Sequence, residues 1–77
     1  MSLPPVDQKP LTELLDTLMR LREVDGRLYR LHAARLPRLS PRARHRTQAT
    51  LRMLDRAMPL TDHSIRKLES AIRRSRR

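Results

Sequence analysis

Apolar side chains recur every three or four residues over the first half of the chain. Their positions are Leu11, Leu14, Leu15, Leu18, Leu21, Val24, Leu28 and Leu31. This spacing marks one face of an α-helix, so it predicts a helix over about residues 11–36. Two interleaved series within it repeat every seven residues: Leu14, Leu21 and Leu28, and Thr17, Val24 and Leu31. Such a repeat is typical of a helix that packs lengthwise against a partner helix in a left-handed coiled coil.

Two shorter helices are predicted after Pro37, which disfavours helical geometry in the residue before it. Ser40 and Pro41 together are typical of a helix start, with serine as the N-cap and proline at the first helical position. Pro59 is expected to end this helix, and Thr61 is expected to cap the next one. The sequence therefore predicts helices over about residues 41–58 and 62–75.

Apolar and arginine side chains are expected on opposite sides of both shorter helices. At about 100° per residue, one side gathers Ala43, Thr47, Thr50, Leu51, Leu54, Ala57 and Met58, and the next helix contributes Ile65, Leu68, Ala71 and Ile72. Burial of these sides would expose the arginines opposite them.

The predicted fold is all-α, because no strand-like alternation and no internal repeat is present. A first helix of about 25 residues is roughly 37 Å long, which is longer than either of the two predicted helices that follow it. We therefore expect a helical hairpin or a three-helix bundle with a long first helix, which forms a dimer through that helix. The oligomer or partner interface is predicted at Leu14, Leu18, Leu21, Val24, Leu28 and Leu31.

The two ends of the chain are expected to lie outside a single helical domain of residues 11–75. Residues 1–10 hold three prolines and are predicted to be a flexible leader, and residues 76–77 a frayed basic tail. No apolar run has the length of a signal peptide core or of a membrane span. Together with the absence of cysteine, this favours a cytoplasmic protein.

Charge is divided unevenly along the chain. Residues 1–28 carry four basic and five acidic side chains, whereas residues 29–77 carry fourteen basic and three acidic ones, for a formal net charge of +10. Such a field attracts polyanions. Sixteen of the eighteen cations are arginines, whose planar fork binds phosphate or carboxylate through two hydrogen bonds. A genome rich in G and C would enrich arginine in the same way without selection for binding.

An enzymatic function is not expected. Acid–base or nucleophilic catalysis needs groups held together in a cleft, and a chain of 77 residues with one aromatic side chain has little material to build one. His32, His45 and His63 lack the three- or four-residue spacing of a helical metal pair. We therefore predict no metal, no cofactor and no small-molecule substrate.

The leading functional hypothesis is a dimer that binds duplex nucleic acid, DNA in particular, through phosphate contacts. The predicted contact residues are Arg42, Arg46, Arg52, Arg56, Arg66, Lys67, Arg73 and Arg74. Single strands are less favoured, because their bases stack on aromatic side chains and Tyr29 is the only one. A helix-turn-helix reader over residues 47–74 is a further possibility, although Asp62 would then begin the recognition helix.

Two other kinds of partner suit a basic amphipathic chain. One is an anionic membrane surface, which such helices usually contact through Trp or Phe, residues that this chain lacks. The other is an acidic protein surface, for which the leucine-rich first helix would serve as the anchor. The alternative hypothesis is therefore a protein interaction module, such as an adaptor, inhibitor or chaperone.

Overall fold

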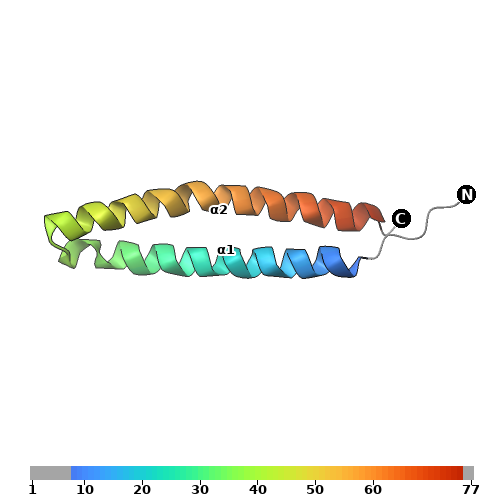
Figure 1. Ribbon diagram of the computed structural model, residues 1–77, viewed down its shortest axis with the longest axis horizontal. Helices are drawn as coiled ribbons and strands as arrows, with labels where there is room; N and C mark the ends of the chain where they lie inside the picture. The colour runs from blue at the N-terminus through green and yellow to red at the C-terminus, as the bar shows by residue number, and fades with distance from the viewer. Residues whose placement is uncertain (1–7, 76–77) are drawn as a thin grey trace, which may run out of the picture.

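The chain folds as an antiparallel hairpin of two long helices in the computed structural model, which describes residues 8–75 (Figure 1). Helix α1 spans Lys9–Arg35, a short 3₁₀ turn η1 spans Leu36–Arg38, and helix α2 spans Pro41–Ser75. No residue in this range forms a strand. The all-α prediction is confirmed, and of the two predicted arrangements the described residues form the helical hairpin.

The start of α1 differs from the predicted leader. Residues 1–7 of that leader and the predicted tail 76–77 lie outside the described residues, but Lys9 and Pro10 already belong to the helix. Proline is tolerated there because the first helical turn does not need its backbone N–H. The Gln8 side chain donates hydrogen bonds to Ser75 Oγ at 2.7 Å and to the Ile72 carbonyl at 3.4 Å. These bonds tie the start of α1 to the end of α2.

The turn between the helices forms as the sequence predicts. Leu36 ends α1, and the Ser40 hydroxyl accepts a hydrogen bond from the Ala43 backbone N–H at 3.3 Å, which is the geometry of an N-cap. Arg44 adds a contact that the sequence did not reveal: it donates to the carbonyls of Leu36 and Leu39. Its guanidinium thereby ties the first turn of α2 to the connection, where the Leu36 carbonyl also accepts from the Leu39 backbone N–H at 3.2 Å.

The predicted break at Pro59 is wrong, because α2 runs through it as one helix of 35 residues. Pro59 and Asp55, whose carbonyl loses its helical donor, are both exposed, so water can bond to that oxygen. Thr61 does not cap a new helix; its hydroxyl donates to the Ala57 carbonyl at 3.2 Å. Helix α2 is bowed (Figure 1), which is the usual effect of an internal proline. A helix-turn-helix over residues 47–74 is thereby excluded.

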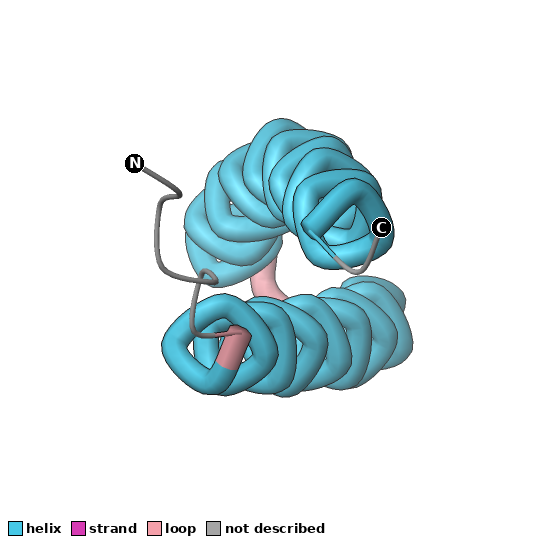
Figure 2. The backbone as a smooth tube through the Cα atoms, turned by 90° about the vertical axis from the view of Figure 1, so that its right-hand side faces the viewer, coloured by secondary structure: helices cyan, strands magenta, loops and turns pink. Residues whose placement is uncertain are grey.

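The two helices contact each other through positions that alternate steps of three and four residues. We call these positions the inner series; they are Leu11, Leu15, Leu18, Arg22, Asp25, Tyr29, His32 and Leu36 on the first helical segment and turn, and Thr47, Leu51, Leu54, Met58, Thr61, Ile65, Leu68 and Ile72 on α2. All are buried or half-buried, but only Leu51 and Ile72 are buried, at 9% and 5% exposure. Figure 2 shows why: each helix has one neighbour, and its remaining sides are open. The positions predicted to be apolar and buried between residues 41 and 72 are all buried or half-buried, but only seven of the eleven belong to the inner series: Thr47, Leu51, Leu54, Met58, Ile65, Leu68 and Ile72.

A charged pair occupies the middle of this contact. Arg22 projects from α1 and donates from Nε to Asp62 Oδ1 at 2.8 Å and from Nη1 to Met58 Sδ at 3.2 Å. It therefore holds α2 on both sides of Pro59. Gly26 leaves room for it, since a Cβ at that position would lie 3.3 Å from Arg22 Nη1.

Candidate nucleic-acid interface

All eight cations predicted to contact phosphate lie on α2, and all are exposed. At about 100° per residue, six of them fall within an arc of roughly 120° on the side of the helix that points away from α1. We call these six the basic face: Arg42, Arg52, Arg56, Arg66, Lys67 and Arg74. The other two, Arg46 and Arg73, lie on opposite flanks of α2, and Arg73 borders a depression shared with Leu15 of α1. The structure therefore groups six of the predicted residues and separates two.

The basic face points outward because the inner series occupies the opposite side of the same helix. Leu51 and Ile72 are the most buried residues of α2; Leu51 lies about three turns from its start, and Ile72 lies in its last turn. Their packing against α1 fixes the orientation of α2 about its own axis, and therefore which of its sides faces solvent. Arg52 follows Leu51 directly and Arg74 lies two residues after Ile72, so both arginines are turned toward solvent.

None of the six basic-face cations makes an ion pair with a residue of the described range 8–75. The three ion pairs in that range all belong to arginines of α1: Arg20 with Asp16 at 3.0 Å, Arg22 with Asp62 at 2.8 Å, and Arg27 with Glu23 at 2.6 Å. The three carboxylates that form these ion pairs thus bind arginines of α1, and no ion pair within residues 8–75 compensates the charge of the basic face. An uncompensated row of cations is the electrostatic requirement for binding an extended polyanion.

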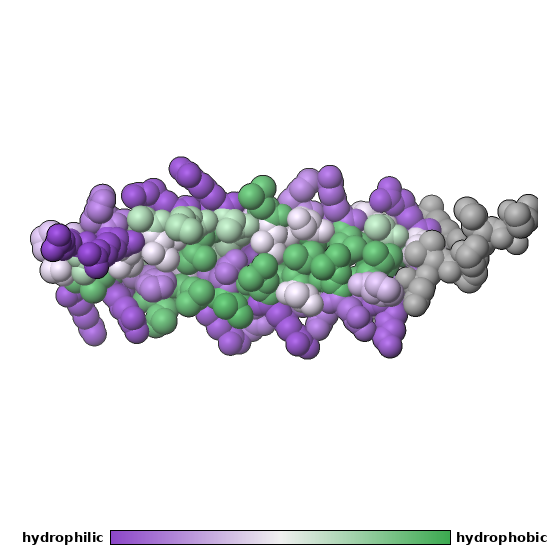
Figure 3. All heavy atoms as spheres, in the orientation of Figure 1, coloured by the Kyte–Doolittle hydropathy of each residue, from purple (hydrophilic) through white to green (hydrophobic). Residues whose placement is uncertain are grey.

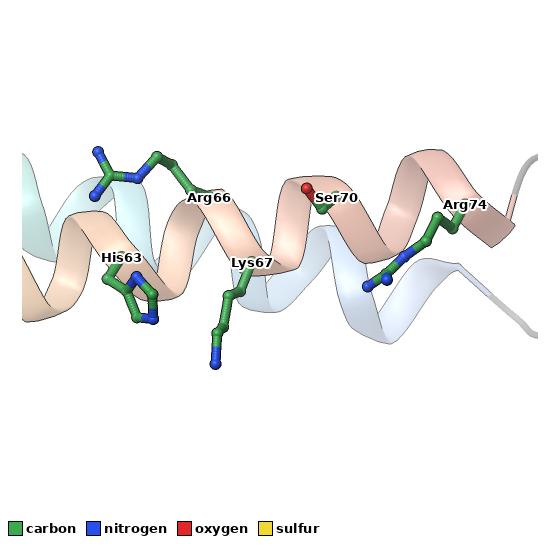
Figure 4. Close-up of a pocket in the computed structure, with 5 residues that line it drawn as sticks. All are labelled: His63, Arg66, Lys67, Ser70 and Arg74. Atoms are coloured by element: carbon green, nitrogen blue, oxygen red, sulfur yellow. The ribbon is translucent and has the colours of Figure 1, made fainter.

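The C-terminal part of the basic face forms a shallow open depression lined by His63, Arg66, Lys67, Ser70 and Arg74. Figure 4 shows that these side chains all rise from α2, with α1 behind them, and that they diverge. In this view Arg66 points up and Lys67 points down, as expected for consecutive residues that lie about 100° apart around a helix. Cations that diverge do not enclose one small anion. They suit phosphates spaced along a strand, each contacted separately.

The predicted interface leucines are mostly uncovered in the hairpin. Leu14, Leu21, Val24, Leu28 and Leu31 are between 39% and 50% exposed, whereas Leu18 is half-buried beside Leu68. Two further apolar residues of this kind are on α2, where the sequence prediction placed none: Met53 and Leu60, at 71% and 69% exposure. Their spacing of seven residues was the signal that could have revealed them.

Other kinds of site find little support within the described residues. No three His, Cys, Asp or Glu side chains there are grouped so as to hold a metal ion, and neither helix combines the length and apolar character needed to cross a bilayer. His45 and His63 are exposed, and His32 is half-buried.

No protein-family model, no curated protein and no solved structure matches this chain.

Proposed function

We propose that the chain binds duplex nucleic acid, with DNA as the expected partner, through phosphate contacts along the basic face of α2. The observation that carries the proposal is the set of six exposed cations on one side of one helix, none of which is paired with a described carboxylate. Each phosphate neutralised by such a cation releases a counterion, which gives affinity without base specificity.

The shape of the basic face supports a duplex partner. From Arg42 to Arg74 it runs for about 48 Å at 1.5 Å per residue. One turn of a duplex is about 34 Å long, so a row of this length spans more than one turn and crosses the phosphate backbones at more than one place. Five of the six cations are arginines, which contact phosphate oxygens through two parallel hydrogen bonds.

A single strand is a poorer partner because the chain offers no stacking platform. Tyr29, the only aromatic residue, belongs to the inner series and is half-buried against α2. Bases of a single strand therefore find no aromatic ring next to the basic face. The proposal includes the predicted homodimer, since two copies double the number of phosphate contacts. It also includes the predicted cytoplasmic location.

Charge removal from α2 tests this proposal. We expect the triple substitution Arg52→Gln, Arg56→Gln and Arg66→Gln to weaken binding to random-sequence duplex. The slope of log K against log salt should fall by about one unit per arginine. Fluorescence anisotropy with a labelled duplex over a series of salt concentrations measures both quantities, and glutamine preserves helix propensity.

The matched control removes the same charge from α1 through Arg20→Gln, Arg27→Gln and Arg30→Gln. It also frees two carboxylates from their ion pairs, so a general charge effect would reduce binding at least as much as in the first variant. Equal losses in the two variants, or no measurable duplex binding by the unmodified chain at about 50 mM salt, contradict the proposal.

A second candidate function is a protein interaction module, and the exposed leucines of α1 favour it. Leu14, Leu21 and Leu31 are about half exposed and lie along one side of the helix. An amphipathic helix of another protein would cover them. In this case nuclease treatment leaves the partner bound, whereas Leu31→Gln releases it.

A further inference from the structure

The hairpin has a second set of heptad positions on both of its helices, and ten of these thirteen positions are exposed. We call it the outer series; it comprises Leu14, Thr17, Leu21, Val24, Leu28 and Leu31 on α1, and Thr50, Met53, Ala57, Leu60, Ser64, Lys67 and Ala71 on α2. Each set advances by alternating steps of three and four residues, as the inner series does. A helix with two such series contacts one neighbour through each of them. In the hairpin only the inner series has a neighbour.

The outer series of the two helices lie on the same face of the molecule. One open groove is lined by Leu14 and Leu18 of α1 together with Ser64, Lys67, Leu68 and Ala71 of α2. In Figure 3 the hydrophobic side chains of both helices gather in a band along this view, with hydrophilic side chains along its borders. An apolar face that continues from one helix onto the next is an unfinished layer of a helical bundle.

We infer that a second copy of this chain covers this face and that two hairpins form a four-helix bundle. The residue sizes of the two outer series are complementary. On α1, Leu14, Leu21 and Leu28 are bulky, whereas the corresponding heptad positions of α2 hold Thr50, Ala57, Ser64 and Ala71. A twofold arrangement that places α1 of each copy over α2 of the other seats large side chains over small ones.

The dimensions of the face also suit a dimer. The outer series extends about 26 Å along α1 and about 32 Å along α2, over two helices that are each at least ~10 Å wide. The projected area is therefore roughly 600 Å², before the relief of the side chains is included. A specific interface of standard size buries about 800 Å² on each partner, about an eighth of the 6687 Å² surface of one chain.

The small core of the hairpin gives a reason for such an interface. Leu51 and Ile72 are the only buried residues in the described range, and both retain some exposure. Chains of this size without disulfides commonly gain stability by association. The inference deepens the homodimer of the proposed function by naming its surface, but it does not depend on nucleic-acid binding.

Charge makes the second copy distinguishable from an acidic partner. Lys67 is the only ionisable residue of the outer series; it also belongs to the basic face and lies at the border between the two, and each copy carries a net charge of +10. Salt screens the repulsion between two such copies, so added salt should strengthen the dimer. Binding of an acidic protein would instead weaken as salt rises.

The mass of the nuclease-treated chain, measured by sedimentation equilibrium over a range of concentrations and at two salt concentrations, tests this inference. We expect twice the 9.1 kDa of one chain. Leu21→Gln on α1 and Leu60→Gln on α2 should each weaken the dimer roughly tenfold or more, since twofold symmetry removes two apolar side chains from the interface. Both residues are exposed in the hairpin, at 47% and 69%, so the contact between α1 and α2 is retained.

Met19→Gln is the matched control, because Met19 is 54% exposed on α1 but lies outside the outer series. It should leave the dissociation constant of the dimer within about twofold, a change of less than ~0.5 kcal/mol. A monomer at every concentration overturns the inference, whether or not the face then binds another protein. An assembly larger than a dimer, or an equal effect of Met19→Gln, also overturns it.

Discussion

At the scale of single residues, Arg22 shows where the hydrophobic pattern misleads. The eight apolar positions of residues 11–31 follow one helical stripe, and the stripe was predicted to form one interface. In the structure it divides: Leu11, Leu15 and Leu18 face α2, whereas Leu21 and Leu28 face solvent. Arg22 continues the inner series because its aliphatic stem packs between the helices while its guanidinium reaches Asp62. No local rule predicts that partner, since Asp62 is 40 residues away.

Gly26 lies beside Arg22, so a substitution there tests how much space the Arg22 side chain needs. We expect Gly26→Ala to raise the free energy of unfolding by about 0.4–1 kcal/mol, because alanine restricts the unfolded chain and favours the helix. The new Cβ displaces Arg22 Nη1 by a few tenths of an ångström, and that atom is held by the weak acceptor Met58 Sδ. Urea unfolding followed by circular dichroism at fixed protein concentration measures the change. A lower midpoint would show that Arg22 requires the space above Gly26.

At the scale of the helices, local signals predicted the ends correctly and the middle wrongly. Ser40 and Pro41 begin α2 as expected, because capping and a first-turn proline depend only on neighbouring residues. Pro59 was expected to separate two helices for equally local reasons. It does not, because Met58 and Ile65 keep contact with α1 on the inner side while the lost hydrogen bond faces water. Tertiary packing thus overrides the propensity of one residue.

The continuity of α2 predicts the effect of Pro59→Ala. In an uninterrupted helix, alanine restores a backbone hydrogen bond to Asp55 and removes a steric clash, so we expect stabilisation by about 1–3 kcal/mol. Pro41→Ala is the control, since proline is favourable at the first helical position and its removal should not stabilise the fold. Chemical unfolding of the two variants at equal concentration provides the comparison. An unchanged or lower stability of Pro59→Ala would indicate two separate helices.

At the scale of the whole molecule, the exposure of the basic face could be predicted from the sequence, whereas its lack of ion pairs and the apolar face shared by both helices could not. The exposure of the arginines follows from the sequence, because burial of Leu51, Leu54 and Leu68 on one side of α2 leaves the other side to solvent. The absence of ion pairs on the basic face does not follow, since Asp62 is near Arg66 in sequence but bonds to Arg22 of α1. The joint apolar face also needed coordinates, because the relative rotation of two helices brings Leu14 beside Ala71.

The position of a bound duplex on the hairpin tests the central claim most directly. Backbone amide shifts of the isotope-labelled chain, recorded at about 0.15 M salt with and without a short random-sequence duplex, report this position residue by residue. We predict that the largest changes fall on the outer side of α2, around Arg52, Arg56, Arg66 and Arg74. Changes centred on the α1 residues Arg20 and Arg27, or spread evenly over both helices, would contradict the account.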